Sequence, residues 1–262
     1  MNNQSLKVDY DVLRKSSNSP SSRTINVAAQ KKLNTIVDKL ENSKVNSFEF
    51  HSLKYVNGNH NTQLFSHLEL AYKMNPKDKE VLKLMTAYYE ITGDEAKKKS
   101  FANQLKKENS YSNDTYEYLK NVLNSVPHNG VLLTYGSLDT YPLFILNAVE
   151  KYRADVNVVS LDLMQSDTYR SKLGAQGFNI PKSTIINLEF FKLFCQLNEH
   201  KDLNLSLTIP KDYFYSIQSK IYATGLAFKY SNEKINNIQH LKNSWNKFEK
   251  NIFEKSKKPN NE

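Results

Sequence analysis

The residues best placed for chemistry lie in one short turn, Gly136-Ser137-Leu138-Asp139-Thr140-Tyr141. The turn follows an apolar run that predicts a strand over 131–135, and Pro142 suits the first position of a helix. Open α/β sheets bind ligands at the carboxyl ends of their strands, and the amino end of a helix favours anions. Asp139 and Thr140 could therefore bind a hydroxylated or metal-bridged ligand. We favour the structural alternative, in which either side chain merely caps the helix that begins at Pro142.

A second carboxylate follows the next predicted strand, over 155–161. Asp162 would lie near the same edge of the sheet as Asp139, and the two could act as a paired-carboxylate site. Ser166, Asp167 and Tyr169 follow Asp162, although Asp167 could serve only as a helix cap. The candidate ligand-binding residues are Gly136, Ser137, Asp139, Thr140 and Asp162.

No complete catalytic signature accompanies these residues. The chain has neither a Gly-x-Ser-x-Gly elbow nor a phosphate-binding Walker loop. None of its histidines forms a metal-type pair on one helix, and no carboxylate completes a set with His60 and His67, which are seven positions apart. The histidines are His51, His60, His67, His128, His200 and His240. We expect no catalytic residue, no metal and no cofactor.

Cys195 is the only cysteine, which excludes a disulfide framework and a zinc site built from several cysteines. It lies in an apolar helical stretch over 190–197, and this setting favours a buried, inert thiol over a nucleophile.

The formal net charge is +9. A basic face could bind nucleic acid, acidic lipid or an acidic partner. The lysines are spread along the chain among Asp and Glu, which favours a solvated surface instead, and we expect no nucleic-acid partner. The local exception is the lysine-rich segment over 250–258, which is typical of a helix end leading into a charged tail.

No apolar run approaches the roughly 18 residues of a membrane span, and the first residues lack the apolar core of a signal peptide. We expect a cytoplasmic protein if this is the native start. If a leader was removed, we expect a periplasmic or envelope-associated one.

The back half, residues 127–262, has the pattern of an α/β domain with a mainly parallel sheet. Strands over 131–135 and 155–161 flank a helix that begins at Pro142, which makes a βαβ unit with parallel strands. A further strand over 184–188 is possible, and residues 203–209 alternate strictly between apolar and polar side chains. Helices are predicted over 213–224 and 232–255, with a last strand over 225–230 between them. The closing helix would bury Ile235, Ile238, Leu241, Trp245, Phe248 and Ile252.

The front half is helical. Residues 1–24 are polar and predict a disordered arm. Residues 25–126 predict successive helices, the first over 25–40 and the last over 114–126. Between them Pro76 breaks one helix, Asp78 caps the next, and Gly93-Asp94 ends it.

This run resembles the tetratricopeptide repeat family over about one and a half repeats, near 62–120. Asn75 and Asn109 are 34 positions apart, which is the period of that family. The other residues that carry the resemblance are Leu70-Ala71-Tyr72, Pro76, Val81-Leu82, Ala87, Tyr88 and Gly93-Asp94. The resemblance implies a partner-binding helical face, for which the candidates are Tyr72, Tyr88 and Tyr89.

The back half also resembles the carboxy-terminal region of the DUF2723 membrane proteins of Bacteroidetes, which are related to protein O-mannosyltransferases. The similar blocks are 130–143, 149–163, 205–210 and 223–230. The resemblance implies the fold, a bacterial origin and an envelope setting. Ser137 and Thr224 stand where the family has acidic residues, and its membrane-embedded sugar-transfer region is absent, so no catalytic residue carries over.

Together these observations favour a non-catalytic adaptor or accessory protein that binds a protein partner in a bacterial envelope-associated complex. One alternative is a small-molecule or glycan-binding domain that uses the 136–141 turn. The other is a glycosyl-transfer-related enzyme acting on phosphorylated or glycosylated substrates. The sequence leaves the oligomeric state open.

Overall fold

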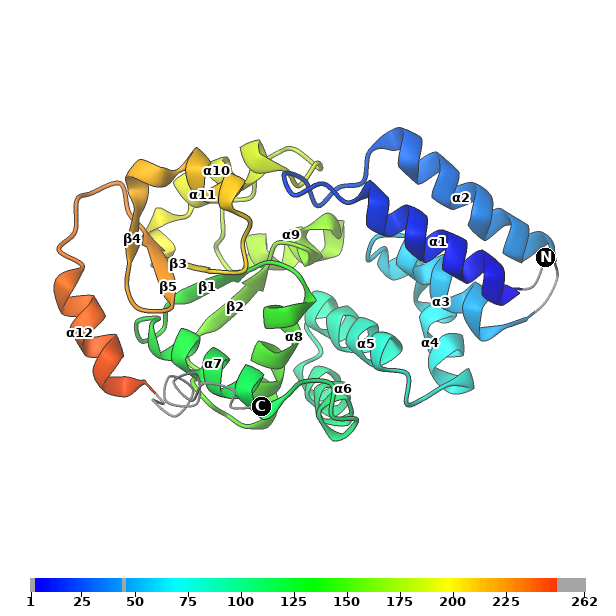
Figure 1. Ribbon diagram of the computed structural model, residues 1–262, viewed down its shortest axis with the longest axis horizontal. Coiled ribbons are helices and arrows are strands. Elements are labelled where there is room, and N and C mark those ends of the chain that lie inside the picture. Colours follow the sequence, from blue (N-terminus) through cyan, green and yellow to red (C-terminus); the bar gives the residue numbers. More distant parts are fainter. Residues whose placement is uncertain (1–2, 44–45, 249–262) are drawn as a thin grey trace, which may run out of the picture. The chain divides into compact units, whose positions relative to one another are not determined.

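The computed structural model describes residues 3–43 and 46–248, and it has the predicted fold class: a helical front half followed by a small domain with a mixed sheet (Figure 1). The chain divides into two compact units. The first, called here the helical unit, comprises Met1–Glu108 and Asp162–Phe191. The second, the sheet unit, comprises Asn109–Leu161 and Lys192–Glu262.

In the described part of the chain, the helical unit contains six successive helices and a seventh, α9, that follows the first two strands of the sheet unit in the sequence. They are α1 (Asn3–Ser17), α2 (Val27–Asn42), α3 (Phe48–Asn57), α4 (Phe65–Met74), α5 (Lys79–Thr92), α6 (Glu95–Lys107) and α9 (Asp167–Ala175), with short 3-10 turns at Thr62–Leu64 and Leu163–Gln165. Local signals set the boundaries as predicted. The Asp78 side chain accepts the Val81 amide at the start of α5, and Gly93 ends α5 with φ 79°.

The predicted disordered arm is wrong for most of its length, because residues 3–17 form α1. Leu6 and Tyr10, four positions apart, are buried against Ala29 and Leu33 of α2. Arg14 holds the Tyr10 hydroxyl with a 3.1 Å hydrogen bond. The segment was predicted to be disordered because most of its residues are polar. Its helix is stabilised by the tertiary packing of two residues, Leu6 and Tyr10.

The sheet unit contains five strands in the order β2-β1-β3-β5-β4. They are β1 (Val131–Thr134), β2 (Asn157–Ser160), β3 (Leu203–Ser206), β4 (Ile221–Ala223) and β5 (Ala227–Tyr230). β1 runs parallel to β2 and β3, as the predicted βαβ unit requires. β5 runs antiparallel to both of its neighbours, so it alone is reversed.

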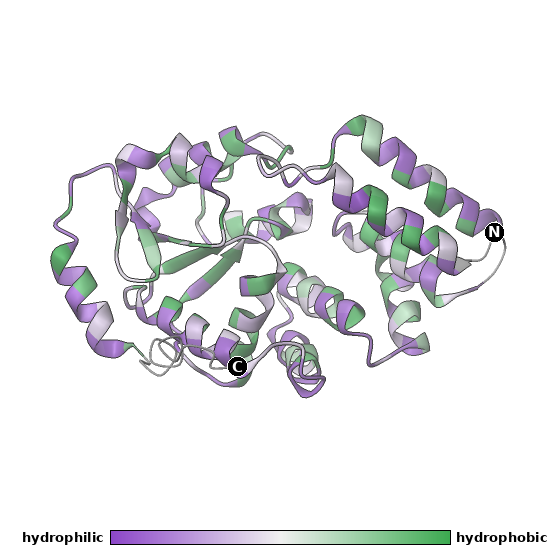
Figure 2. Cartoon of the chain, in the orientation of Figure 1, coloured by the Kyte–Doolittle hydropathy of each residue, from purple (hydrophilic) through white to green (hydrophobic). Residues whose placement is uncertain are grey.

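The helices of this unit are α7 (Asn113–Asn124), α8 (Ser137–Phe144), α11 (Lys211–Ser216) and α12 (Ile238–Lys247), while α10 (Leu188–Leu197) crosses the division between the units. Short helical turns follow at Ile145–Val149, Glu199–Lys201 and Gln218–Lys220. Figure 2 shows β1 and β2 as mostly hydrophobic segments. All four residues of β1 are buried, because helices cover a parallel sheet on both faces.

Three predicted elements of the back half differ from the structure. Residues 184–188 form no strand, because Asn187 makes only an isolated bridge to Ser22 before α10 begins. The helix predicted over 213–224 ends at Ser216, because Ile221–Ala223 pairs with β5 as strand β4. The alternation over 203–209 does not mean an exposed face: β3 ends at Ser206, and its four residues are all buried.

The closing helix is shorter than predicted, and its apolar side is not buried. α12 spans Ile238–Lys247, and the predicted Ile252 lies outside the described residues. Ile238 is 59% exposed, Leu241 38% and Trp245 51%. The helical spacing correctly predicted that these apolar residues share one face of the helix. It did not predict that this face is exposed, because periodicity does not say what covers an apolar face.

Candidate functional site

The 136–141 segment is a helix start rather than an open turn. Gly136 leaves β1 with φ 82° and ψ 179°, a conformation that only glycine adopts readily, and α8 begins at the next residue. Pro142 therefore lies inside α8 and not at its first position. Ser137 and Leu138 are exposed at this end of the helix, whereas Asp139 and Thr140 are buried.

Asp139 belongs to a buried network of hydroxyl groups. Its Oδ2 accepts a hydrogen bond from Thr208 just beyond β3, and its Oδ1 lies 3.5 Å from the Thr140 hydroxyl. The Thr140 hydroxyl is 2.8 Å from that of Thr134 at the end of β1. Neither side chain caps α8, whose cap residue is Gly136. The network joins the carboxyl ends of β1 and β3, the edge at which a ligand was expected.

The carboxylate of Asp139 also affects a neighbouring phenol. Burial raises the pKa of Tyr118 in α7, and the charge of Asp139 raises it further. A buried carboxylate surrounded by hydroxyl groups is stabilised mainly by hydrogen bonds. This arrangement can hold the start of α8 against the carboxyl ends of β1 and β3.

Asp162 lies in the helical unit, where it forms an ion pair with Arg23. Asp139 lies in the sheet unit, so each carboxylate has a partner within its own unit. A site formed by the two carboxylates of Asp139 and Asp162 stays a prediction. Asp167 is the first residue of α9 and pairs with Arg170.

The surroundings of Asp162 include a strained histidine. His60 has φ 65° and follows Asn59 with φ 49°, two consecutive left-handed residues that are not glycine. Burial lowers the pKa of His60 to about 4, with Arg14 and Arg23 acting in the same direction and Asp162 opposing them. Among the described residues, nothing forms a hydrogen bond with its Nδ1.

A second histidine feature was missed from the sequence. His51 in α3 and His67 in α4 face each other with their Nδ1 atoms 2.8 Å apart, so one imidazole donates to the other. The Nε2 of His51 is 2.5 Å from Asn46 Oδ1. Burial and the charge of His67 lower the pKa of His51. Burial and the charge of Lys54 lower that of His67, against an opposing effect of Glu41.

The histidine pair was not predictable because its partners come from separate helices, 16 positions apart. Within the described part of the chain, no three His, Cys, Asp or Glu side chains gather as a metal site would require.

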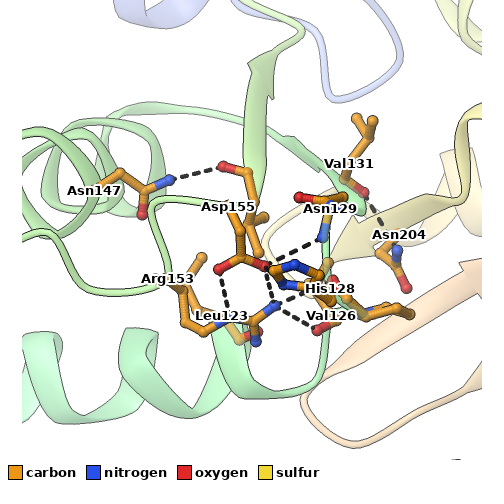
Figure 3. Close-up of polar contacts among 11 residues, drawn as sticks. Leu123, Val126, His128, Asn129, Val131, Asn147, Arg153, Asp155 and Asn204 are labelled. Atoms are coloured by element: carbon orange, nitrogen blue, oxygen red, sulfur yellow. Dashed lines mark hydrogen bonds and ion pairs between the residues drawn. The ribbon is translucent and has the colours of Figure 1, made fainter.

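Arg153 makes the densest set of polar contacts in the sheet unit (Figure 3). Its guanidinium pairs with both oxygens of Asp155 at 2.9 and 2.8 Å. The same group donates to the carbonyls of Leu123, Val126 and Pro127 at 2.7 to 3.1 Å. It therefore ties the end of α7 to the start of β2, because cations stabilise the exposed carbonyls of a helix end.

The carboxylate of Asp155 is stabilised in its charged form. Asp155 Oδ2 also accepts the Asn129 amide at 3.2 Å and lies 3.0 Å from His128 Nδ1. The hydrogen bond from Arg153 holds the pKa of Asp155 well below its usual range. These contacts give Arg153 and Asp155, which are two positions apart, a structural role.

The three tyrosines predicted to bind a partner lie in one aromatic cluster, defined here as Phe65, Tyr72, Tyr88, Tyr89 and Phe101 of α4, α5 and α6. Phe65 stacks on Tyr88 at 4.0 Å and Tyr89 on Phe101 at 5.4 Å. Tyr72 meets Phe101 edge-on at 5.2 Å. Tyr89 is buried, whereas Tyr72 and Tyr88 are half-buried and keep part of their rings accessible.

Cys195 is buried in α10, as predicted. Burial raises the pKa of its thiol far above the usual value, so the thiolate that a nucleophile requires is disfavoured.

An open pocket of about 480 Å³ lies at the opposite edge of the sheet, where β3 begins and β5 ends. The Nζ of Lys229 lies 2.5 Å from Oδ1 of Asp202 and forms an ion pair with it. The carboxylate of Glu199 accepts hydrogen bonds from the backbone and side-chain amides of Asn232. The other lining residues are His200, Tyr230, Ser231, Glu233 and Ile235. The sequence gave no signal for this pocket, because its walls come from two separated segments.

Comparison with known families matches residues 115–190 to TMEM260-associated domain 2. This segment runs from α7 to the start of α10 and includes the Arg153–Asp155 pair and the 136–141 segment. It covers less than half of the chain. No curated protein and no solved structure matches the sequence.

The match corrects the predicted relationship. The family found is TMEM260-associated domain 2 and not DUF2723, so that prediction was wrong, and the expected Bacteroidetes origin and envelope setting lose their support. What the structure bears out of the tetratricopeptide resemblance is a helical segment alone. Among the described residues, no helix combines the length and apolar character needed to cross a membrane.

Proposed function

We propose that this chain is a non-catalytic adaptor or accessory protein that binds a protein partner through the aromatic cluster of α4, α5 and α6. The observation that carries the proposal is the partial exposure of Tyr72 and Tyr88 within an otherwise packed cluster. Tyrosine is enriched at protein interfaces, because its large ring loses little conformational entropy on binding while its hydroxyl keeps a polar contact.

The contacts within the cluster hold these rings in place before a partner arrives. The Tyr72 hydroxyl donates to Gln104 Oε1 at 2.9 Å, and Tyr88 is fixed between Phe65 and Tyr89. The ammonium of Lys97 lies 5.2 Å from the centre of the Tyr89 ring, which adds a positive charge beside the surface. A preorganised aromatic surface binds with a smaller entropic cost than a mobile one.

The non-catalytic part of the proposal is supported by the use of the candidate carboxylates. Asp139 accepts a hydrogen bond from Thr208, Asp162 pairs with Arg23, and Asp167 pairs with Arg170. Each of these contacts has a structural explanation that requires no substrate.

The proposal is tested by affinity capture with Tyr88→Ala and with a matched control, Tyr215→Ala. Tyr215 lies in α11 of the sheet unit and is 62% exposed, so its removal changes another tyrosine surface. We expect Tyr88→Ala to lose a stoichiometric partner that wild type and Tyr215→Ala retain. The loss of a half-buried ring, with its stacking and its buried area, should cost about 2 to 4 kcal/mol of stability, so a melting curve checks that each variant is folded before the capture. Identical capture by all three proteins would refute the proposal.

A second candidate function has its own observation. The buried Asp139 carboxylate and its hydroxyl neighbours occupy the carboxyl edge of β1 and β3, where parallel sheets bind small molecules. This supports a small-molecule or glycan site at 136–141, with Ser137 accessible beside it.

A further inference from the structure

α12 places large apolar side chains in solvent. Ile238, Leu241 and Trp245 recur every three or four residues and are 59%, 38% and 51% exposed. Ser244 is the only described residue of this helix that is buried. Figure 2 shows hydrophobic and hydrophilic segments alternating along α12, as an amphipathic helix requires.

Polar contacts help to hold α12 on the sheet unit. The Ser244 hydroxyl donates to the carbonyl of Thr224 at 2.6 Å. Asn124 of α7 donates to the carbonyl of Lys247 at 3.0 Å, which fixes the end of the helix. Asn237 donates to the carbonyl of Ala223 at 2.9 Å just before the helix begins. The helix is thus oriented with its apolar residues facing outward.

The charge around this face is positive. α12 contains Lys242 and Lys247 and no acidic residue, while the charges of Glu233 and Lys234, which precede it, offset each other. By contrast, the exposed Val8 and Val12 of α1 are interleaved with Asp9 and Asp11.

A basic helix with an exposed tryptophan-bearing face has the chemistry of helices that lie in the headgroup region of a bilayer. Such helices bury apolar side chains at the acyl boundary, while their lysines attract anionic lipid. Tryptophan favours this interface because its ring is apolar and its N–H remains hydrated. A protein partner would gain from the apolar residues but has no special need for the surrounding lysines.

We propose that α12 is an interfacial helix that lays Ile238, Leu241 and Trp245 onto the surface of a membrane containing anionic lipid. The helix lies on the bilayer and does not cross it. This function is independent of the aromatic cluster on α4, α5 and α6, and either proposal can fail without the other.

Trp245 is the only tryptophan of the chain, so its fluorescence reports on α12 without a label. Vesicles of equal parts phosphatidylcholine and phosphatidylglycerol should shift its emission to the blue and bring the full chain down on sedimentation. Vesicles of phosphatidylcholine alone should do so weakly, and added salt should reduce the binding, because exposed charges are screened.

Substitutions in α12 test whether this helix is the part of the chain that binds the vesicles. The double substitution Ile238→Ser and Leu241→Ser should weaken vesicle binding by more than about tenfold, because two apolar side chains no longer enter the interface. Lys242→Glu should weaken binding to anionic vesicles alone. Leu138→Ser is the matched control, since Leu138 is 74% exposed on α8 and should not affect binding.

Three results would overturn the proposal. The first is the absence of a blue shift with anionic vesicles. The second is equal binding by wild type and the Ile238→Ser, Leu241→Ser variant. The third is a concentration-dependent dimer, in the absence of lipid, that the same variant abolishes, because α12 would then be an interface between copies of the chain.

Discussion

The imidazole pair of His51 and His67 makes the helical unit sensitive to acid. Their Nδ1 atoms are 2.8 Å apart, so the contact requires at least one neutral ring. The pKa of each lies below the ordinary histidine value, mainly because of burial. The unfolded chain therefore takes up protons at a higher pH than the folded chain does. Stability is fully present above about pH 6.5 and is lost as the pH falls below it.

We predict that His67→Gln makes the melting temperature less dependent on pH between about pH 7.5 and about pH 5.5. The substitution removes one titrating ring, while the glutamine amide can still donate to His51. His60, whose pKa is lowered to about 4, contributes in the same direction and should leave some dependence in place. Calorimetry across this range measures the effect. The control is His200→Gln at an exposed histidine, and an unchanged pH profile for His67→Gln would contradict the interpretation.

A substitution of Asp139 distinguishes a ligand-binding role of the 136–141 segment from a purely structural one. We predict that Asp139→Asn, which keeps the shape of the side chain, weakens the Thr208 contact and lowers the free energy of unfolding by about 1 kcal/mol. If the 136–141 site binds a small molecule, a sugar or nucleotide that stabilises the wild type thermally should no longer stabilise the variant. A ligand whose stabilisation is the same for both proteins does not use this carboxylate.

At the scale of elements, side chains at helix ends decide how segments join. Arg153 fastens the end of α7 to the start of β2, although its own φ of 45° is unfavourable for an arginine. In the helical unit, buried Glu90 of α5 pairs with Lys98 of α6 at 2.8 Å and Lys172 of α9 at 2.7 Å. Burial alone would lower the pKa of Lys98, but the charges of Glu90 and Glu95 and their hydrogen bonds to the ammonium together outweigh it, so the net pKa is raised.

We predict that Arg153→Lys destabilises the protein by about 2 to 4 kcal/mol, because one ammonium cannot replace a fork that serves three carbonyls and a carboxylate. Chemical denaturation measures the change. The matched control is Lys73→Ala, which removes an exposed pair with Glu69 and should cost less than about 0.5 kcal/mol. Equal effects of the two substitutions would show that the Arg153 contacts are weak.

At the scale of the whole molecule, the predictable features are those with a local cause. The parallel pairing of β1 with β2 follows from two apolar runs around an amphipathic helix, and the limits of α5 follow from Asp78 and Gly93. The features missed depend on pairing or packing with another element. α1 needed α2 to bury Tyr10, and β4 needed β5 as a partner.

Ligand binding at 136–141 stays a prediction, but the place of this segment in the fold was predicted. It follows β1 and begins α8, because a strand followed by glycine and a helix sets that geometry locally. The burial of Asp139 was not foreseen, since Thr208 lies 69 positions away. For α12, too, the spacing of the residues predicts an apolar face. The exposure of that face could not be predicted, because it depends on how the rest of the chain folds.

The helical unit is completed by a segment from far along the chain, and this fixes an order of events during synthesis. Glu90 emerges from the ribosome 82 positions before Lys172, and the first strands of the sheet unit are made in between. The buried carboxylate must wait for one of its two cations until α9 has been translated. A fragment cut at residue 126, the boundary that the sequence suggests, would lack that cation permanently.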